Sequence, residues 1–484
     1  MRTTVLSVRA PTRFPAYRSS ELTRGRFSAA GLDFPTVASA ILITSYFYCL
    51  PLGRYSVGGF GTDFRAYDIV NLLFLLCIGP QFLRRVQLLW RDSARFFYWG
   101  VVLSALAWVS LAFTFSTSGA GGLPAVIRAI RFSVYLIVPA FLMVIASTPR
   151  RLHLLLGVFY INTVIQAVLA FGQGLHLIPN LWPDYWLRSY AAGEQVLPIG
   201  TLSPHHKQIG VVMVLGVGLS LFFARASSKV VYRILALSVV PIMVAVPIFG
   251  GSRTAWLGFI ALGVGFLLVY RTRAGWVALL AVLTAGAGFL LMPDVAVEKM
   301  KNAVEHRLID VLENRGVEGL GNGRLDIYLE QIPSALARQP WILLIGTGFA
   351  NATSIMGMNA HNNYAQALVE LGIAGLVIFL IMLHRVWRTL HAAAVLGRCK
   401  FDSLLAKDLM AVFFSVLTTM LVGETLWSSY SMFTLTGQVM GLMALGSASL
   451  NWAATGSPLS KFPRSLRRPG YNSGRGAKRF VAAV

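Results

Sequence analysis

Charge and cysteine are both scarce in this chain. Only 13% of its 484 residues are charged, whereas soluble domains carry about 25%. Acidic residues are the rarer kind, with 19 Asp and Glu against 42 Lys and Arg. The low charge content excludes an ordinary soluble domain. Three cysteines, Cys49, Cys77 and Cys399, are too few and too dispersed to suggest a disulfide framework or a metal site.

Apolar residues take the place of charge along nearly the whole chain. They make up 56% of it, and the mean hydropathy is +0.65. Apolar runs of roughly 17–25 residues are long enough to cross a hydrocarbon core of ~30 Å. The first run can itself span, so we expect no cleavable signal peptide. We predict an all-α polytopic membrane protein with twelve spans, near residues 34–51, 67–83, 98–116, 125–147, 152–175, 206–224, 231–249, 254–270, 274–292, 363–384, 408–426 and 429–450.

The net charge of +23 is distributed unevenly. The positive-inside rule assigns the side of the membrane that carries more Lys and Arg to the cytoplasm. The basicity is therefore a topology signal and does not indicate nucleic-acid binding. We expect the basic tail to contact membrane lipids. With twelve spans, the basic clusters fall on one side, in both terminal segments and in the connections at residues 84–95, 150–151, 225–233, 271–273 and 385–407.

The chain is organised as one membrane domain between two basic ends. Residues 1–33 form a basic cytoplasmic arm, residues 34–453 the membrane domain, and residues 454–484 a basic tail. We expect the arm and the tail to be disordered. The longest outward connection, residues 293–361, is expected to be helical in part. Connections of this length inside a compact domain are usually functional.

Four arginines fall on the outward side, against the charge rule. Arg128 and Arg131 lie three residues apart near the outward end of one span, and Arg188 lies in an aromatic outward loop. Arg253 lies in the short turn Gly-Gly-Ser-Arg-Thr. Guanidinium groups bind phosphate through paired hydrogen bonds, and a helix amino terminus adds further donors. These arginines predict an outward-facing diphosphate site, although Arg128 and Arg131 can instead reach toward lipid headgroups.

Histidines mark a second candidate group. His361 stands where the long outward connection meets a span, followed by Asn362 and Asn363. An imidazole can take a proton from a sugar hydroxyl near neutral pH, which is the task of a general base. His205 and His206 open the sixth span from outside and either cap it or touch substrate.

Three further charged residues have two readings each. Arg324, in Gly-Asn-Gly-Arg, either starts a helix or contacts substrate. Glu370 and Glu424 fall within predicted spans. Ionisable residues at such positions are rare. They either bond a neighbouring helix terminus or arginine, or take part in a proton path.

The spacing of these motifs resembles that of the bacterial O-antigen ligase/polymerase superfamily. His361-Asn362 is followed after nine residues by Gly372-x-x-Gly375. A threonine often found next in ligases is Leu376 here. The segments at 200–206, 251–254 and 323–348 are similar to the family's sixth-span opening, second arginine motif and outer loop. The family's first arginine has no direct equivalent before Gly200, and Arg188 is its stand-in.

The resemblance implies a GT-C-like fold and a glycan transferase. Such an enzyme takes a glycan from undecaprenyl diphosphate on the outer, periplasmic face of the cytoplasmic membrane and passes it to an acceptor sugar hydroxyl, without metal or nucleotide. Arg253, with Arg188 or the pair Arg128 and Arg131, would hold the diphosphate. His361 would deprotonate the acceptor, which gives inversion at the anomeric carbon. Asn362 or Asn363 would orient the acceptor.

Two questions stay open at this point. The acceptor is either another lipid-linked repeat, as in a repeat-unit polymerase, or a lipid A core, as in an O-antigen ligase; we slightly favour the polymerase. A polytopic transporter is the alternative from another class. It predicts internal repeats and a polar midplane, whereas the polar residues of this chain concentrate on one outer edge.

Overall fold

The computed structural model describes the greater part of the predicted membrane domain. Apart from Asp33, the described residues belong to one compact unit, residues 34–484. The description covers residues 33–48, 51–57, 60–83, 95–118, 122–146, 148–181, 199–202, 206–250, 252–270, 330–338, 340–352, 362–397, 399–423, 426 and 433–450.

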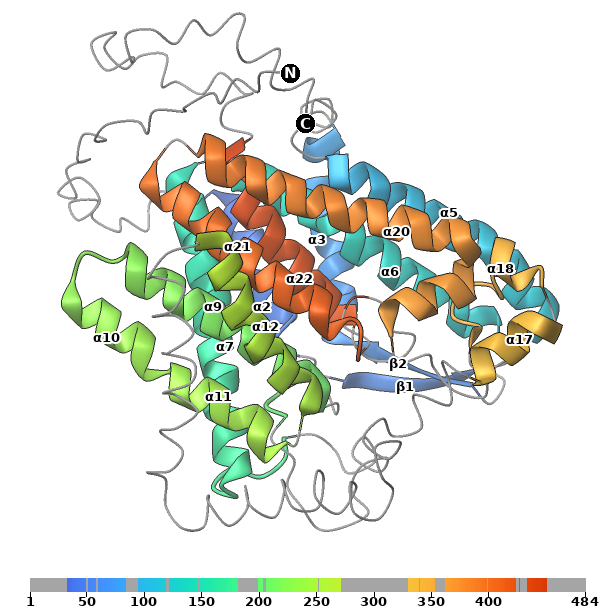
Figure 1. The fold of residues 1–484 in the computed structure, drawn as a ribbon, viewed down its shortest axis with the longest axis horizontal. Coiled ribbons are helices and arrows are strands. Elements are labelled where there is room, and N and C mark those ends of the chain that lie inside the picture. The colour runs from blue at the N-terminus through green and yellow to red at the C-terminus, as the bar shows by residue number, and fades with distance from the viewer. Residues whose placement is uncertain are drawn as a thin grey trace, which may run out of the picture. The chain divides into compact units, whose positions relative to one another are not determined.

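Helices dominate these residues, as predicted, and one antiparallel hairpin was not foreseen (Figure 1). The hairpin joins β1 (Pro51–Val57) to β2 (Phe60–Arg65), with Pro51 opposite Arg65. The helices are α2 (Phe34–Ser45), α3 (Ala66–Leu83), α5 (Arg95–Ser118), α6 (Gly122–Ile145), α7 (Pro149–Gly174), α9 (His206–Ala226), α10 (Val230–Ser238), α11 (Val240–Phe249), α12 (Arg253–Tyr270), α17 (Ile332–Arg338), α18 (Ile342–Ile345), α20 (Asn363–Leu396), α21 (Lys400–Thr419) and α22 (Phe433–Ser447).

Several of these helices can cross a bilayer. Within the described ranges, six segments are long and apolar enough: Phe97–Ser116, Pro124–Ile145, Pro149–Gly174, Gln208–Ala226, Val230–Phe249 and Asn363–Leu396. Three shorter apolar helices, Phe34–Ser45, Ala66–Pro80 and Thr254–Tyr270, coincide with further predicted spans. The chain is thus a multi-pass membrane protein. The predicted span 274–292 lies outside the described residues, and α21 and α22, at the predicted spans 408–426 and 429–450, are not among these segments. The count of twelve therefore stays a prediction.

Helix α21 runs antiparallel to both α12 and α20. Ser415 Oγ donates to Gly258 O at 2.6 Å, near the amino end of α12. Asn363 N, at the start of α20, donates to Met420 O at 3.0 Å, just past the end of α21. The amino ends of α12 and α20 and the carboxyl end of α21 therefore meet at one end of the bundle, which we call the Asn363 end.

Helices α9 and α12 run parallel, so α9 also begins at the Asn363 end. A Cβ placed on Gly210 would lie 2.7 Å from Ala255 Cβ, and one on Gly218 would lie 3.9 Å from Leu262 Cδ1. At the opposite end, Arg225 of α9 forms an ion pair of 2.6 Å with buried Asp408 of α21. Tyr270 of α12 donates to the same carboxylate. This contact fixes the three helices at the end away from Asn363.

Candidate functional site

The structure describes the predicted site residues to different extents. Arg128, Arg131, Asn362 and Asn363 are described with their side chains, whereas only the backbones of His206 and Arg253 are described. His361, Arg188, His205 and Arg324 lie outside the described residues. The geometry of the site is therefore built from the residues that flank them.

Arg253 is the first residue of α12. The carbonyl of Ser252 accepts from Ala255 N at 3.0 Å and from Trp256 N at 3.3 Å, which forms the first turn of the helix. Ser252 N donates to Pro247 O at 2.9 Å and so closes the turn from α11. The short Gly-Gly-Ser-Arg-Thr turn thus places Arg253 at a helix amino terminus, as the sequence predicts.

Two asparagines fix the start of α20, directly after His361. Asn362 is the N-cap: its Oδ1 accepts from Tyr364 N at 2.8 Å and from Ala365 N at 3.1 Å. Asn363 is fully buried, and its Oδ1 accepts from Leu426 N at 3.1 Å. Both amide oxygens bond to backbone groups, so these two residues fix the first turn of α20.

A short segment connects the starts of α12 and α20. We call residues 420–423 and 426 the α21 exit segment. Its Met420 and Leu426 bond to Asn363. A Cβ on its Gly423 would lie 3.1 Å from Thr254 Cγ2, in the first turn of α12. One segment thus contacts the residue after Arg253 and the second residue after His361.

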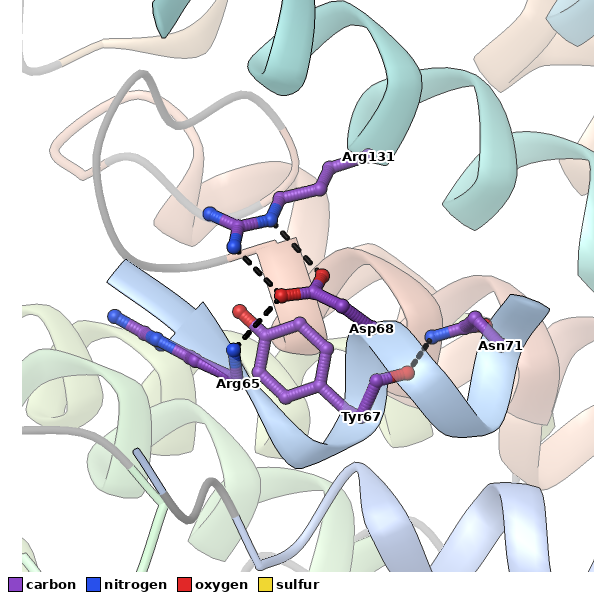
Figure 2. Close-up of polar contacts among 5 residues, drawn as sticks. All are labelled: Arg65, Tyr67, Asp68, Asn71 and Arg131. Carbon is purple, nitrogen blue, oxygen red and sulfur yellow. Dashed lines mark hydrogen bonds and ion pairs between the residues drawn. The ribbon is translucent and has the colours of Figure 1, made fainter. Parts of the chain in front are cut away.

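Arg131 forms a buried ion pair with Asp68 of α3 (Figure 2). Asp68 Oδ1 accepts from Arg131 Nε at 3.0 Å and Oδ2 from Nη2 at 2.6 Å. Oδ2 also accepts from Arg65 N at 3.0 Å. The Arg131 side chain is only 8% exposed, so it does not reach out to headgroups. Arg128 lies one turn earlier on α6 and is half-buried.

Aromatic rings surround this ion pair. The guanidinium carbons of Arg65 and Arg131 lie 5.7 and 5.9 Å from the centre of the Tyr67 ring, within cation–π range. Tyr135 packs on Tyr67 at 6.1 Å. We call Arg65, Tyr67, Asp68, Arg131 and Tyr135 the Arg131 cluster. The sequence reading missed Arg65, although an arginine in the connection between the first two predicted spans breaks the same charge rule.

The Arg131 cluster also belongs to the Asn363 end. A Cβ on Gly437 of α22 would lie 2.5 Å from Tyr135 Cδ1. Its neighbour Thr436 donates to Leu426 O at 2.8 Å. A continuous series of contacts therefore runs from Arg131 through α22 to the α21 exit segment.

The glycines of the family motif allow a loop to dock on a break in α20. Gly372 has φ 68° and ψ −169°, so the helix is interrupted there. A Cβ on it would collide with Leu344 O. The carbonyls of Val369 and Glu370 accept instead from Thr347 N at 2.8 Å and Gly348 N at 3.0 Å. The outer connection is thereby anchored shortly before His361.

The same loop is bonded to α5. Phe349 N donates to Ser110 Oγ at 3.0 Å, and Thr114 Oγ1 donates to Phe349 O at 2.9 Å. Glu370 faces the interior: it is fully buried and accepts from Gln366 Nε2 at 2.5 Å. A neighbouring side chain of the same helix thus partners this intramembrane carboxylate.

The segment before His205 is held by two buried glutamines of α7. Gln173 Oε1 accepts from Ile199 N at 3.0 Å and Gly200 N at 2.7 Å. Gln166 Oε1 accepts from Thr201 N at 2.8 Å. Gly200 has φ 60°, and a Cβ there would meet the Gln166 amide. The two glutamines therefore fix the turn at residues 199–202, shortly before α9.

Comparison with known families adds one finding. A family model described as O-antigen ligase matches residues 237–380, which include Arg253, His361 and both motif glycines. The match confirms the family resemblance, although it covers less than a third of the chain. A search of curated proteins found no match.

Proposed function

We propose that this chain of the O-antigen ligase/polymerase superfamily transfers a glycan from undecaprenyl diphosphate to an acceptor sugar hydroxyl at the periplasmic face of the cytoplasmic membrane. The family implies a glycan-transferring enzyme in general. One observation supports the specific reaction: the α21 exit segment contacts both the amino end of α12, which carries Arg253, and the amino end of α20, which follows His361.

Arg253 is the principal diphosphate ligand in this proposal. Its position at the start of an 18-residue helix adds backbone donors and a favourable dipole for an anion. Arg128 and Arg188 would add positive charge on the same side, and Arg131 would lie near the diphosphate with its charge balanced by Asp68. As the bond to the sugar breaks, these groups stabilise the negative charge that develops on the leaving diphosphate.

His361 is the general base. It takes the proton of the acceptor hydroxyl as the oxygen forms a bond to the anomeric carbon. The bond between that carbon and the diphosphate oxygen breaks, and undecaprenyl diphosphate leaves with the electron pair. Attack from the face opposite the leaving group inverts the anomeric centre. No metal is required, since the arginines and the helix terminus supply the positive potential.

The acceptor defines two versions of the proposal. In the first, a second lipid-linked repeat is the acceptor and the protein is a repeat-unit polymerase. In the alternative, the acceptor is a lipid A core and the protein is an O-antigen ligase. Offering each acceptor separately to membranes that hold the protein and a labelled donor distinguishes the two versions.

Transfer assays with variants test the reaction itself. We expect His361→Ala to lower transfer by a factor of at least about 100, the usual contribution of a general base. Arg253→Ala and Arg253→Lys should both be impaired, because an ammonium lacks the guanidinium fork. Arg233→Ala, on exposed α10, is the matched control and should transfer normally. Near-normal turnover by the His361 variant would contradict the general-base role.

A further inference from the structure

Ser252 is a buried serine whose hydroxyl has no hydrogen-bond partner. Its side chain is 1% exposed, and no described residue bonds its Oγ. A serine directly before a helix usually caps the first turn through that oxygen. Leaving a buried hydroxyl without a partner costs free energy, so the position calls for an explanation.

The hydroxyl lies between the start of α12 and the second turn of α9. A Cβ on Gly210, in the second turn of α9, would lie 2.9 Å from Ser252 Oγ and 2.7 Å from Ala255 Cβ. The absence of a side chain at Gly210 therefore lets α9 and α12 start side by side. The two helices are 21 and 18 residues long and run parallel, so their dipoles add at this end.

A second unused donor belongs to the same turn. Trp256 Nε1 is buried and has no hydrogen-bond partner among the described residues. An indole N–H can only donate, and a serine hydroxyl can donate as well. Two helix amino ends add backbone N–H groups that have no partner within their own helices. A ligand that accepts hydrogen bonds from all of these groups would be an anion rich in acceptor oxygens.

We propose that the paired amino ends of α9 and α12, with the Ser252 hydroxyl and the Trp256 indole as donors, form a binding site for the carrier diphosphate, which we call the seat. The inference rests on the proposed function, since it adds residues to the donor side of that same site. Two adjacent helix ends suit a ligand with two phosphoryl groups, because each end can receive one. Ser252 and Trp256 are then binding residues for the donor, next to Arg253.

Binding of farnesyl diphosphate to the purified full-length protein tests the seat. We expect Ser252→Ala to raise its Kd about tenfold, which corresponds to one hydrogen bond to a charged group. Trp256→Phe should weaken binding in the same direction. The melting temperature of Ser252→Ala should not fall, because the substitution removes a buried hydroxyl that has no partner in the unliganded protein.

Ser449→Ala is the matched control. Ser449 Oγ is also buried without a partner, but it lies beyond the carboxyl end of α22, away from the Asn363 end. This variant should keep both its Kd and its melting temperature. Farnesol should not compete, inorganic pyrophosphate should compete, and phosphatidylglycerol vesicles should not. Competition by phosphatidylglycerol alone would identify a lipid-headgroup site and overturn the proposal.

The outcomes separate the seat from the reaction. Wild-type affinity in Ser252→Ala and Trp256→Phe would overturn the seat, as would failure of the wild-type protein to bind farnesyl diphosphate. If these variants bind weakly while His361→Ala still transfers glycan, the seat stands and the proposed mechanism fails. If His361→Ala is inactive but binds farnesyl diphosphate normally, both proposals are supported.

Discussion

Asp68 shows how one acidic side chain can serve two purposes in a chain that has few acidic residues. It stands in the first turn of α3, where it accepts from Arg65 N and helps to start the helix. It also holds Arg131, 63 residues further along, through two hydrogen bonds. Each of these contacts limits how the Arg131 guanidinium can turn. Asp68 therefore controls the geometry of an arginine that the proposed function places near the diphosphate.

Asp68→Asn should destabilise the protein. Removing one partner of a buried ion pair typically costs about 3 kcal/mol, because the other charge is left buried. We expect a lower melting temperature in detergent and reduced glycan transfer. The exchanged pair Asp68→Arg with Arg131→Asp should recover much of the stability and none of the transfer. Recovery of transfer by the exchanged pair would show that Arg131 has only a structural role.

At the scale of elements, the break in α20 is the feature that shapes the site. A straight helix of 34 residues would be about 51 Å long, well beyond the ~30 Å hydrocarbon core. The interruption at Gly372 separates a short first segment from Ile373–Leu396. It also exposes two backbone carbonyls, which the loop at Thr347 and Gly348 bonds. The motif glycine thus joins the outer connection to the helix that follows His361.

Gly372→Ala tests this role. An alanine there needs a left-handed backbone conformation and meets Leu344 O, so we expect a loss of about 1–3 kcal/mol in stability and a large loss of transfer. Gly157→Ala in α7 is the matched control, because a Cβ at that position meets nothing within 4 Å. That control should be neutral or slightly more stable. Equal behaviour of the two variants in thermal unfolding would contradict the docking role of Gly372.

At the scale of the whole molecule, the features that the sequence predicts are those that the bilayer requires. Apolar runs locate the helices because a span needs about 20 apolar residues, and the turn at Arg253 was predicted from its local composition. The pair of Asp68 and Arg131 could not be predicted in the same way, because it depends on how α3 packs on α6. The hairpin at 51–65 was missed, since it is short and lies between two strong helical signals. Gly372 was identified as a motif glycine, but the break that it makes in α20 was not predicted.

The orientation of the molecule gives the last prediction. Charge distribution predicts that the Asn363 end lies outside and that the connection between α20 and α21, with Cys399, lies in the cytoplasm. Ser116, exposed at the carboxyl end of α5, lies at the Asn363 end, because α5 bonds the loop that docks on α20. In a chain with Cys49 and Cys77 replaced by serine, a membrane-impermeant maleimide applied to spheroplasts should label Ser116→Cys and spare Cys399 until detergent is added.

The rate at which maleimide labels Cys399 depends on pH, and the direction of this dependence follows from the desolvation of the thiol. Desolvation raises the pKa of the Cys399 thiol above its ordinary value, so less of it is thiolate at a given pH. Labelling of Cys399 in detergent should therefore speed up as the pH rises through 8, and a comparison made only at pH 7 would undercount it.

The reverse pattern, with Cys399 labelled in intact spheroplasts and Ser116→Cys protected, would place the Asn363 end in the cytoplasm. A donor carried on the outer leaflet could not then reach Arg253, and the proposed reaction would fail with the topology.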